Sequence, residues 1–228
     1  MTRIGKGRGI YDNIRKCLQY LLAGNTAEIL VMLVAILAGW PIPLLPLQIL
    51  WINLVTDGLP ALALAADPVD PGVLSRPPRR RADSFLDREF CFRLLGIGLM
   101  SAGVTLAAFA WGLFVVRDVA VARSLAFSTL VCEELLRSLG VRSLDHPLWR
   151  NPAPPNRWLL GVIPVSLLIQ IVLHETPALH GPFGTRPMDL TTTACVFLLG
   201  SVPLLVLEFA KLRRRPSRIA AGHSPACD

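Results

Sequence analysis

The sequence has little charge and no paired cysteine motif. Only 17% of its 228 residues are charged, whereas 53% are hydrophobic and the mean hydropathy is +0.52. These values exclude a soluble globular protein and indicate a membrane protein. The cysteines are odd in number and lack a C-x-x-C pair, so neither a disulfide framework nor a soft-metal site is indicated. They stand at Cys17, Cys91, Cys132, Cys195 and Cys227.

The net charge of +7 is the one feature that favours a nucleic-acid partner. However, the basic residues stand between apolar runs and do not form one polar segment, as is typical of loops beside membrane spans. We therefore expect the lipid bilayer as a partner and no nucleic acid. We also expect no cleavable signal peptide, because the first apolar run is too long and contains Asn25 and Glu28.

Six apolar runs are long enough to cross about 30 Å of hydrocarbon. They are expected at residues 14–38, 44–65, 90–116, 121–139, 158–173 and 190–210. Twenty of the 23 lysines and arginines fall on one side of this arrangement, and only Arg117, Arg123 and Arg186 fall on the other. The positive-inside rule then places both termini in the cytoplasm.

The predicted fold is therefore all-α, a polytopic membrane bundle of six transmembrane helices. We divide the chain into a cytoplasmic stub at residues 1–13, a membrane domain at 14–212 and a basic cytoplasmic tail at 213–228. The polar loop at 67–89 contains four prolines and three consecutive arginines, which exclude it from the membrane.

A short polar motif interrupts the second expected span. Asn53, Thr56 and Asp57 stand at i, i+3 and i+4, so that an amide, a hydroxyl and a carboxylate share one helix face. Pro60 has no N–H to donate to the carbonyl of Thr56, and Gly58 loosens the same turn. We predict a partly unwound helix with a freed backbone oxygen beside these side chains, a ligand set that calcium prefers.

Two further spans carry an acid within an apolar run. Glu28 shares a helix face with Asn25 in the first span, and Glu134 lies in the fourth. Asn25 and Glu28 alone are equally consistent with hydrogen bonding between helices. If Glu28, Asp57 and Glu134 converge, however, their repulsion favours a bound divalent cation, which protons can replace.

The fourth span also contains Glu133 and Arg137. Because adjacent helical residues point about 100° apart, only one of Glu133 and Glu134 can face the cluster squarely. Arg137 stands three residues after Glu134 and four after Glu133. The spacing allows it to neutralise either glutamate near the membrane surface, which is the alternative to a role at a cation site.

Four stretches carry motifs specific enough to name a family. They are the run Gly7-Arg8-Gly9-Ile10-Tyr11-Asp12-Asn13-Ile14-Arg15-Lys16, the run Asn25-Thr26-Ala27-Glu28, the segment Leu50 to Pro60, and Arg76-Pro77-Pro78. These stretches resemble the carboxy-terminal transmembrane half of P-type calcium ATPases of the sarcoplasmic-reticulum type. The resemblance extends over almost the whole chain and implies that the six spans correspond to the fifth to tenth helices of such pumps.

The resemblance implies a set of calcium ligands, with Asp57 bridging two ion sites. The implied ligands are Asn25, Glu28, Asn53, Thr56, Asp57 and Glu134. Arg137 departs from the family, which often has a neutral residue there. Its guanidinium can take the place of one cation and leave a single-ion pump. Manganese accepts the same oxygen ligands as calcium and is the alternative ion.

The motor of such pumps is missing from the sequence. It contains no Asp-Lys-Thr-Gly-Thr phosphorylation motif and no Thr-Gly-Glu actuator motif. We therefore expect no ATPase activity from this chain alone, with ATP and Mg²⁺ acting only through domains absent from it. The expected function is the membrane part of a calcium pump, as a fragment or split subunit in a bacterial plasma membrane. The alternatives are a regulatory module that docks on a complete pump and a non-functional remnant.

Overall fold

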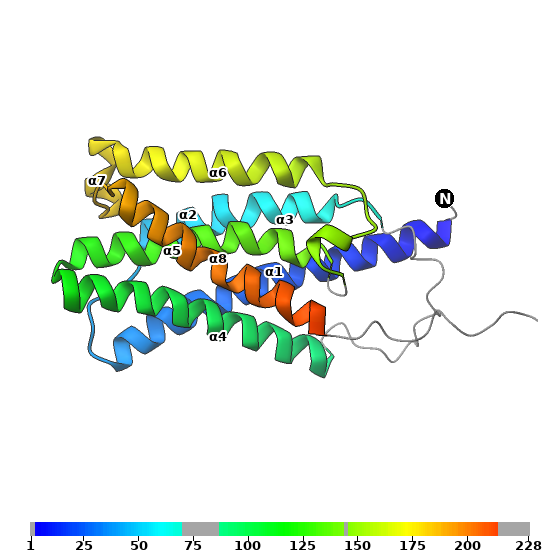
Figure 1. Ribbon diagram of the computed structural model, residues 1–228, viewed down its shortest axis with the longest axis horizontal. Helices are drawn as coiled ribbons and strands as arrows, with labels where there is room; N and C mark the ends of the chain where they lie inside the picture. Colours follow the sequence, from blue (N-terminus) through cyan, green and yellow to red (C-terminus); the bar gives the residue numbers. More distant parts are fainter. Residues whose placement is uncertain (1–2, 70–86, 144–145, 214–228) are drawn as a thin grey trace, which may run out of the picture.

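The computed structural model describes residues 3–69, 87–143 and 146–213, and these residues form helices and connecting loops without a strand. Five long rods and one interrupted rod lie side by side, alternating in direction along the bundle (Figure 1). The long helices are α1 (Arg3–Leu37), α4 (Arg88–Ala110), α5 (Val119–Val141), α6 (Arg157–Glu175) and α8 (Leu190–Arg213). The interrupted rod comprises α2 (Pro46–Trp51), the π-helical turn η1 (Ile52–Asp57) and α3 (Gly58–Ala65). The predicted all-α bundle is confirmed.

Five segments among the described residues are long and apolar enough to cross a membrane. They are Gly7–Leu37, Pro46–Ala65, Arg88–Val116, Arg157–Glu175 and Leu190–Arg213. The fourth expected span, α5, does not meet this criterion because Glu133, Glu134 and Arg137 lie within it. It nevertheless runs the length of the bundle (Figure 1). The charged helix is accommodated because the other helices enclose it.

The burial pattern places α5 at the centre of the bundle. Seventeen of its 23 residues are buried, and it packs against α1, α4, α6 and α8. The outer helices instead expose large apolar side chains, such as Leu99 of α4, Leu168 of α6 and Leu205 of α8. An apolar exterior around a polar central helix is the arrangement expected in a bilayer, where polar side chains face the bundle interior.

Several boundaries differ from those expected. Helix α1 begins at Arg3, so the helix of the first expected span also includes most residues of the predicted stub, 1–13. A short helix, α7 (Pro177–Phe183), lies within the expected loop at 174–188. The break between α4 and α5 is sharper than a polar loop, because the π-helical turn η3 (Trp111–Val116) ends at Arg117 with a φ of 61°.

Parts of two predicted segments lie outside the described residues. They are residues 70–86, which include Arg76-Pro77-Pro78 and the three arginines of the second loop, and residues 214–228 of the basic tail. The first described turn of α1 and the last turn of α8 lie at the same end of the bundle (Figure 1). Their common side agrees with the predicted topology.

The second span is widened, and its unwinding is confined to one π-helical turn. η1 covers the motif from Ile52 to Asp57, and α3 resumes at Gly58. A π-helical turn places one more residue in each hydrogen-bonded ring, which redirects side chains and is frequent at functional sites. At the other end of the rod, Gln48 donates to the carbonyl of Phe183 at 2.8 Å and so ties α2 to α7.

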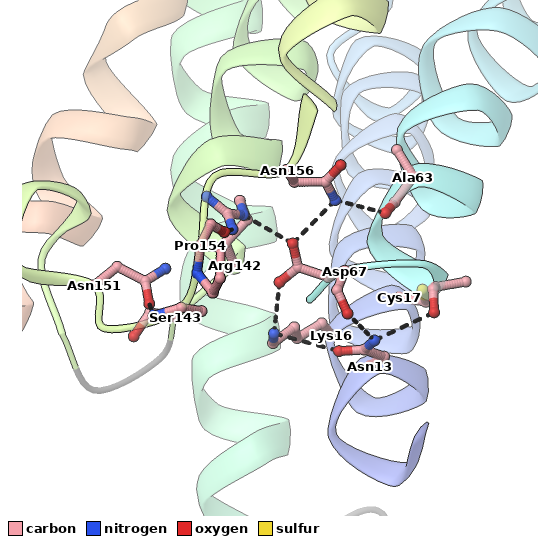
Figure 2. A network of polar contacts seen from close by, with 12 residues as sticks. Asn13, Lys16, Cys17, Ala63, Asp67, Arg142, Ser143, Asn151, Pro154 and Asn156 are labelled. Atoms are coloured by element: carbon pink, nitrogen blue, oxygen red, sulfur yellow. Dashed lines mark hydrogen bonds and ion pairs between the residues drawn. The ribbon is translucent and has the colours of Figure 1, made fainter. Parts of the chain in front are cut away.

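A buried carboxylate, Asp67, joins four elements at the end of the bundle where α1 begins (Figure 2). One of its oxygens accepts from Lys16 of α1 at 2.8 Å, and the other accepts from Arg142 and Asn156, each at 2.9 Å. Its backbone carbonyl accepts from Asn13 at 2.7 Å. Asn156 also caps α6. Asp67 therefore fixes α1, α3, α5 and α6 relative to one another.

Asp67→Asn should destabilise the bundle strongly. The asparagine leaves Lys16 and Arg142 without a counter-charge in a mostly buried site, and breaking a buried ion pair in this way typically costs about 3–5 kcal/mol. The measurement is thermal unfolding in detergent, followed by circular dichroism. Glu89→Gln is the matched control, because its exposed pair with Arg93 is of a kind worth about 0.2–1 kcal/mol. Equal melting temperatures for the two variants would contradict the assignment of Asp67 as a structural joint.

Candidate cation site

Three carboxylates converge inside the bundle from three different elements. Glu28 comes from α1, Asp57 from the widened turn η1 and Glu134 from α5, and one oxygen of each lies within 4.8 Å of the others. All three side chains are buried, with exposed fractions of 7%, 2% and 0%. The condition stated for the sequence, that these acids converge, is therefore met in the structure.

The other predicted ligands lie at different depths around this cluster. Thr56 is buried beside Asp57 on the same turn. Asn53 is exposed, donating to the carbonyl of Ile49 at 2.9 Å and more distantly to Glu28 at 3.4 Å. Asn25 is half-buried, and its side chain forms no hydrogen bond within the described part of the chain. The carboxylates thus form the centre and Asn53 lies beside Glu28, whereas no contact among the described residues joins Asn25 to the cluster.

The cluster contains many oxygens without a donor. Among the described residues, both carboxylate oxygens of Asp57 and Glu134, one of Glu28 and the hydroxyl oxygen of Thr56 are buried without a hydrogen-bond partner. Buried polar atoms are nearly always paired in folded proteins, because an unpaired one costs free energy. An oxygen-coordinated cation satisfies several such atoms at once, and calcium takes six to eight oxygen ligands.

Gly24 brings the backbone of α1 against the cluster. A methyl group added at its Cα would lie 2.8 Å from Oε1 of Glu134 and 3.4 Å from Oδ1 of Asp57. A side chain there would force the carboxylate of Glu134 to shift, whereas Asp57 would stay at van der Waals distance. This residue was not identified from the sequence, because its role depends on the distance between α1 and the helices that carry Asp57 and Glu134.

Arg137 is fully buried but does not pair with the glutamates that precede it. Its guanidinium donates to the carbonyl of Tyr20 at 3.2 Å and lies over the ring of that tyrosine, 5.1 Å from its centre. No carboxylate of the described residues lies within ion-pair distance of it. A methyl group added at Gly24 would lie 3.2 Å from Nη2 of Arg137. This is close to where it would contact Glu134, so the guanidinium charge lies at the carboxylate cluster.

Glu133 points toward α4, away from Glu134. Oε1 of Glu133 accepts from the hydroxyl of Thr105 at 3.2 Å, and the side chain is fully buried. The expectation that adjacent glutamates face different directions is met. Glu133 therefore belongs to the contact between α4 and α5 and not to the cluster.

The carbonyl of Thr56, to which Pro60 cannot donate, accepts a hydrogen bond from Tyr20 instead. Its hydroxyl donates to the carbonyl of Thr56 at 2.7 Å, and the tyrosine is fully buried. The prediction of a carbonyl freed from helical bonding was therefore incomplete, since a side chain of α1 takes that bond. A carbonyl oxygen has two lone pairs, so one remains available.

Comparison with known proteins identifies the family of this chain. Residues 41–213 match the profile of the family described as cation transporting ATPase, C-terminus. The chain belongs to this family. The match begins just before the interrupted second span and includes every helix from α2 to α8. Two of the three clustered carboxylates, Asp57 and Glu134, lie within the matched region.

Two curated relatives are similar over nearly all of the chain. A calcium-transporting ATPase of Bacillus subtilis (strain 168) is 37% identical over 219 residues, which cover 94% of this chain and 24% of the relative. Calcium-transporting ATPase 1 of Bacillus cereus (strain ATCC 10987 / NRS 248) is 33% identical over 228 residues, covering 93% and 26%. The chain thus spans about a quarter of the length of these relatives. Together with the apolar helices, the family identifies a multi-pass membrane segment of a P-type cation ATPase.

Tyr20→Phe should loosen the widened turn without affecting distant helices. Removing the hydroxyl leaves the carbonyl of Thr56 buried without this donor, and an intramolecular hydrogen bond of this kind contributes about 1 kcal/mol. Hydrogen–deuterium exchange of peptides covering residues 52–61 should therefore accelerate about fivefold, a factor that corresponds to 1 kcal/mol. Peptides from α4 in the same sample are the internal control. Unchanged exchange at residues 52–61 would show that the hydroxyl does not hold this turn.

Proposed function

We propose that this chain carries the ion-binding site of a calcium pump and holds one Ca²⁺ between Glu28, Asp57 and Glu134. The observation that carries the proposal is the convergence of these three buried carboxylates from three elements within 4.8 Å. Ionisable groups inside a membrane bundle are expensive and mark ion paths by default. The names of the two Bacillus relatives support calcium as the ion.

The donor chemistry favours a hard cation. The cluster consists of carboxylates with the hydroxyl of Thr56 nearby, and no cysteine or histidine of the described residues belongs to it. Oxygen ligands suit calcium and manganese, whereas zinc and copper prefer nitrogen or sulfur. Asn25, Asn53 and Thr56 complete the proposed ligand set with neutral oxygens. Manganese remains the alternative cargo, since it accepts the same donors.

The charges favour a single ion. Three ionised carboxylates contribute three negative charges, and the buried guanidinium of Arg137 beside Gly24 contributes one positive charge. One divalent cation balances the remaining two charges. A second would leave an excess of positive charge in a medium of low dielectric constant, where charges interact strongly. Arg137 therefore takes the place of a second cation.

The proposed transport step uses the connection between α1 and the site. Glu28 lies on the same continuous helix as Lys16, which is held by Asp67 at the end of the bundle. Once the contact between Lys16 and Asp67 breaks, a displacement of α1 at that end moves Glu28 and Gly24 relative to Asp57 and Glu134, which opens the cluster. ATP and Mg²⁺ act through a catalytic part that this chain does not contain, supplied by a longer polypeptide or by a separate subunit in a bacterial plasma membrane.

The direct test is equilibrium binding of radioactive calcium to the chain in lipid nanodiscs. We expect one ion per chain, and we expect Asp57→Asn to lower its affinity at least 100-fold, because Asp57 offers two unpartnered oxygens to the cluster. Glu175→Gln is the control, since this glutamate is exposed at the end of α6. Full affinity in Asp57→Asn would refute the site. Binding of two ions would refute the role of Arg137, and a preference for manganese would reassign the cargo.

Gly24→Ala tests the geometry of the cluster without removing a ligand. The added methyl group lies too close to Oε1 of Glu134, so this carboxylate must shift away from its place in the cluster and calcium affinity should fall about tenfold. Gly7→Ala is the matched control on the same helix, because a methyl group there meets nothing within 4 Å. Circular dichroism checks that both variants fold. Equal affinities in the two variants would show that close approach of α1 is not required.

A further inference from the structure

A groove separate from the carboxylate cluster opens between α4 and α8. It encloses about 290 Å³ and is closed on its inner side by residues of α1 and α5. Ile97 and Met100 of α4 and Val206 and Leu207 of α8 form its apolar walls. Gly96 lines it without filling it, since a methyl group added there meets nothing within 4 Å.

One end of the groove is polar and contains two unpartnered atoms. Nε of Arg93 is a buried donor without an acceptor, although the end of the same guanidinium pairs with Glu89 at 2.5 Å. Oε1 of Gln19 is a buried acceptor without a donor, and this side chain is only 2% exposed. Lys211 also lines this end, where it donates to the carbonyl of Gly140 at 2.6 Å and pairs with Glu208.

The position of the groove matches the headgroup boundary of a bilayer. Arg93 lies in the second turn of α4 and Lys211 in the last turn of α8, at the end of the bundle that the positive-inside rule places in the cytoplasm (Figure 1). The apolar walls continue from there along outer helices that expose Leu99 and Leu205. The polar end is therefore at headgroup depth, and the apolar walls are at the depth of the acyl chains.

We propose that this groove binds a phospholipid. The phosphate accepts from Nε of Arg93, and one acyl chain lies over Gly96 between Met100 and Val206. Water can form hydrogen bonds at the polar end, but neither water nor a free phosphate can make hydrophobic contacts with the apolar walls. An amphipathic molecule whose head offers an acceptor to Nε of Arg93 and a donor to Oε1 of Gln19 matches both parts. Basic side chains near the membrane surface attract lipid headgroups by their charge as well.

The test is native mass spectrometry of the chain released from mild detergent, with retained phospholipid counted per chain. The wild-type chain should retain one phospholipid, and Gly96→Leu, which fills the groove, should reduce its occupancy about tenfold. Gly161→Leu is the matched control, because this glycine of α6 also faces open space outside the groove. Equal retention in the two variants would overturn the proposal.

Two further measurements separate the parts of this proposal. Arg93→Gln should lower occupancy several-fold, and unchanged occupancy would overturn the assignment of the phosphate to this arginine. If Gly96→Leu does not fold, Met100→Trp narrows the same groove and should give the same loss. Calcium binding should persist in Gly96→Leu, so that failure of the lipid site is distinguishable from failure of the proposed cation site.

Discussion

Like charges held together away from water are the constraint on which this structure depends. Glu28, Asp57 and Glu134 meet inside a bundle whose exterior is apolar, and most of their oxygens have no donor. Asp67, by contrast, is a buried carboxylate whose two oxygens are fully hydrogen-bonded. They accept from Lys16, Arg142 and Asn156. The contrast separates a structural acid from the three acids that we propose hold an exchangeable cation.

The rest of the bundle serves that arrangement. Gly24 allows α1 to approach, the widened turn η1 carries Asp57 inward, and the hydroxyl of Tyr20 holds the carbonyl that Pro60 leaves free. The central position of α5 encloses its charged residues within the other helices. Asp67 then fixes α1, α3, α5 and α6 relative to one another at the end of the bundle where α1 begins.

Much of this organisation could be predicted from the sequence. Hydropathy located six rods, and polar residues spaced along apolar runs identified the three acids, because such residues are costly in a membrane. Pro60 and Gly58 located the irregular turn, but neither its π-helical form nor the hydrogen bond from Tyr20 to the carbonyl of Thr56 follows from the local sequence. Gly24 and the contacts of Arg137 could not be predicted, because both depend on the distance between α1 and α5. The joint at Asp67 links residues up to 89 positions apart, and no local pattern reports such a contact.

The measurement that tests this account most directly is the anomalous scattering of calcium in crystals of the chain, collected at long wavelength. The account predicts one peak bounded by the carboxylates of Glu28, Asp57 and Glu134, at the distance of about 2.3–2.6 Å that calcium keeps from oxygen. A peak elsewhere in the bundle, or no peak between these three side chains at saturating calcium, would contradict it.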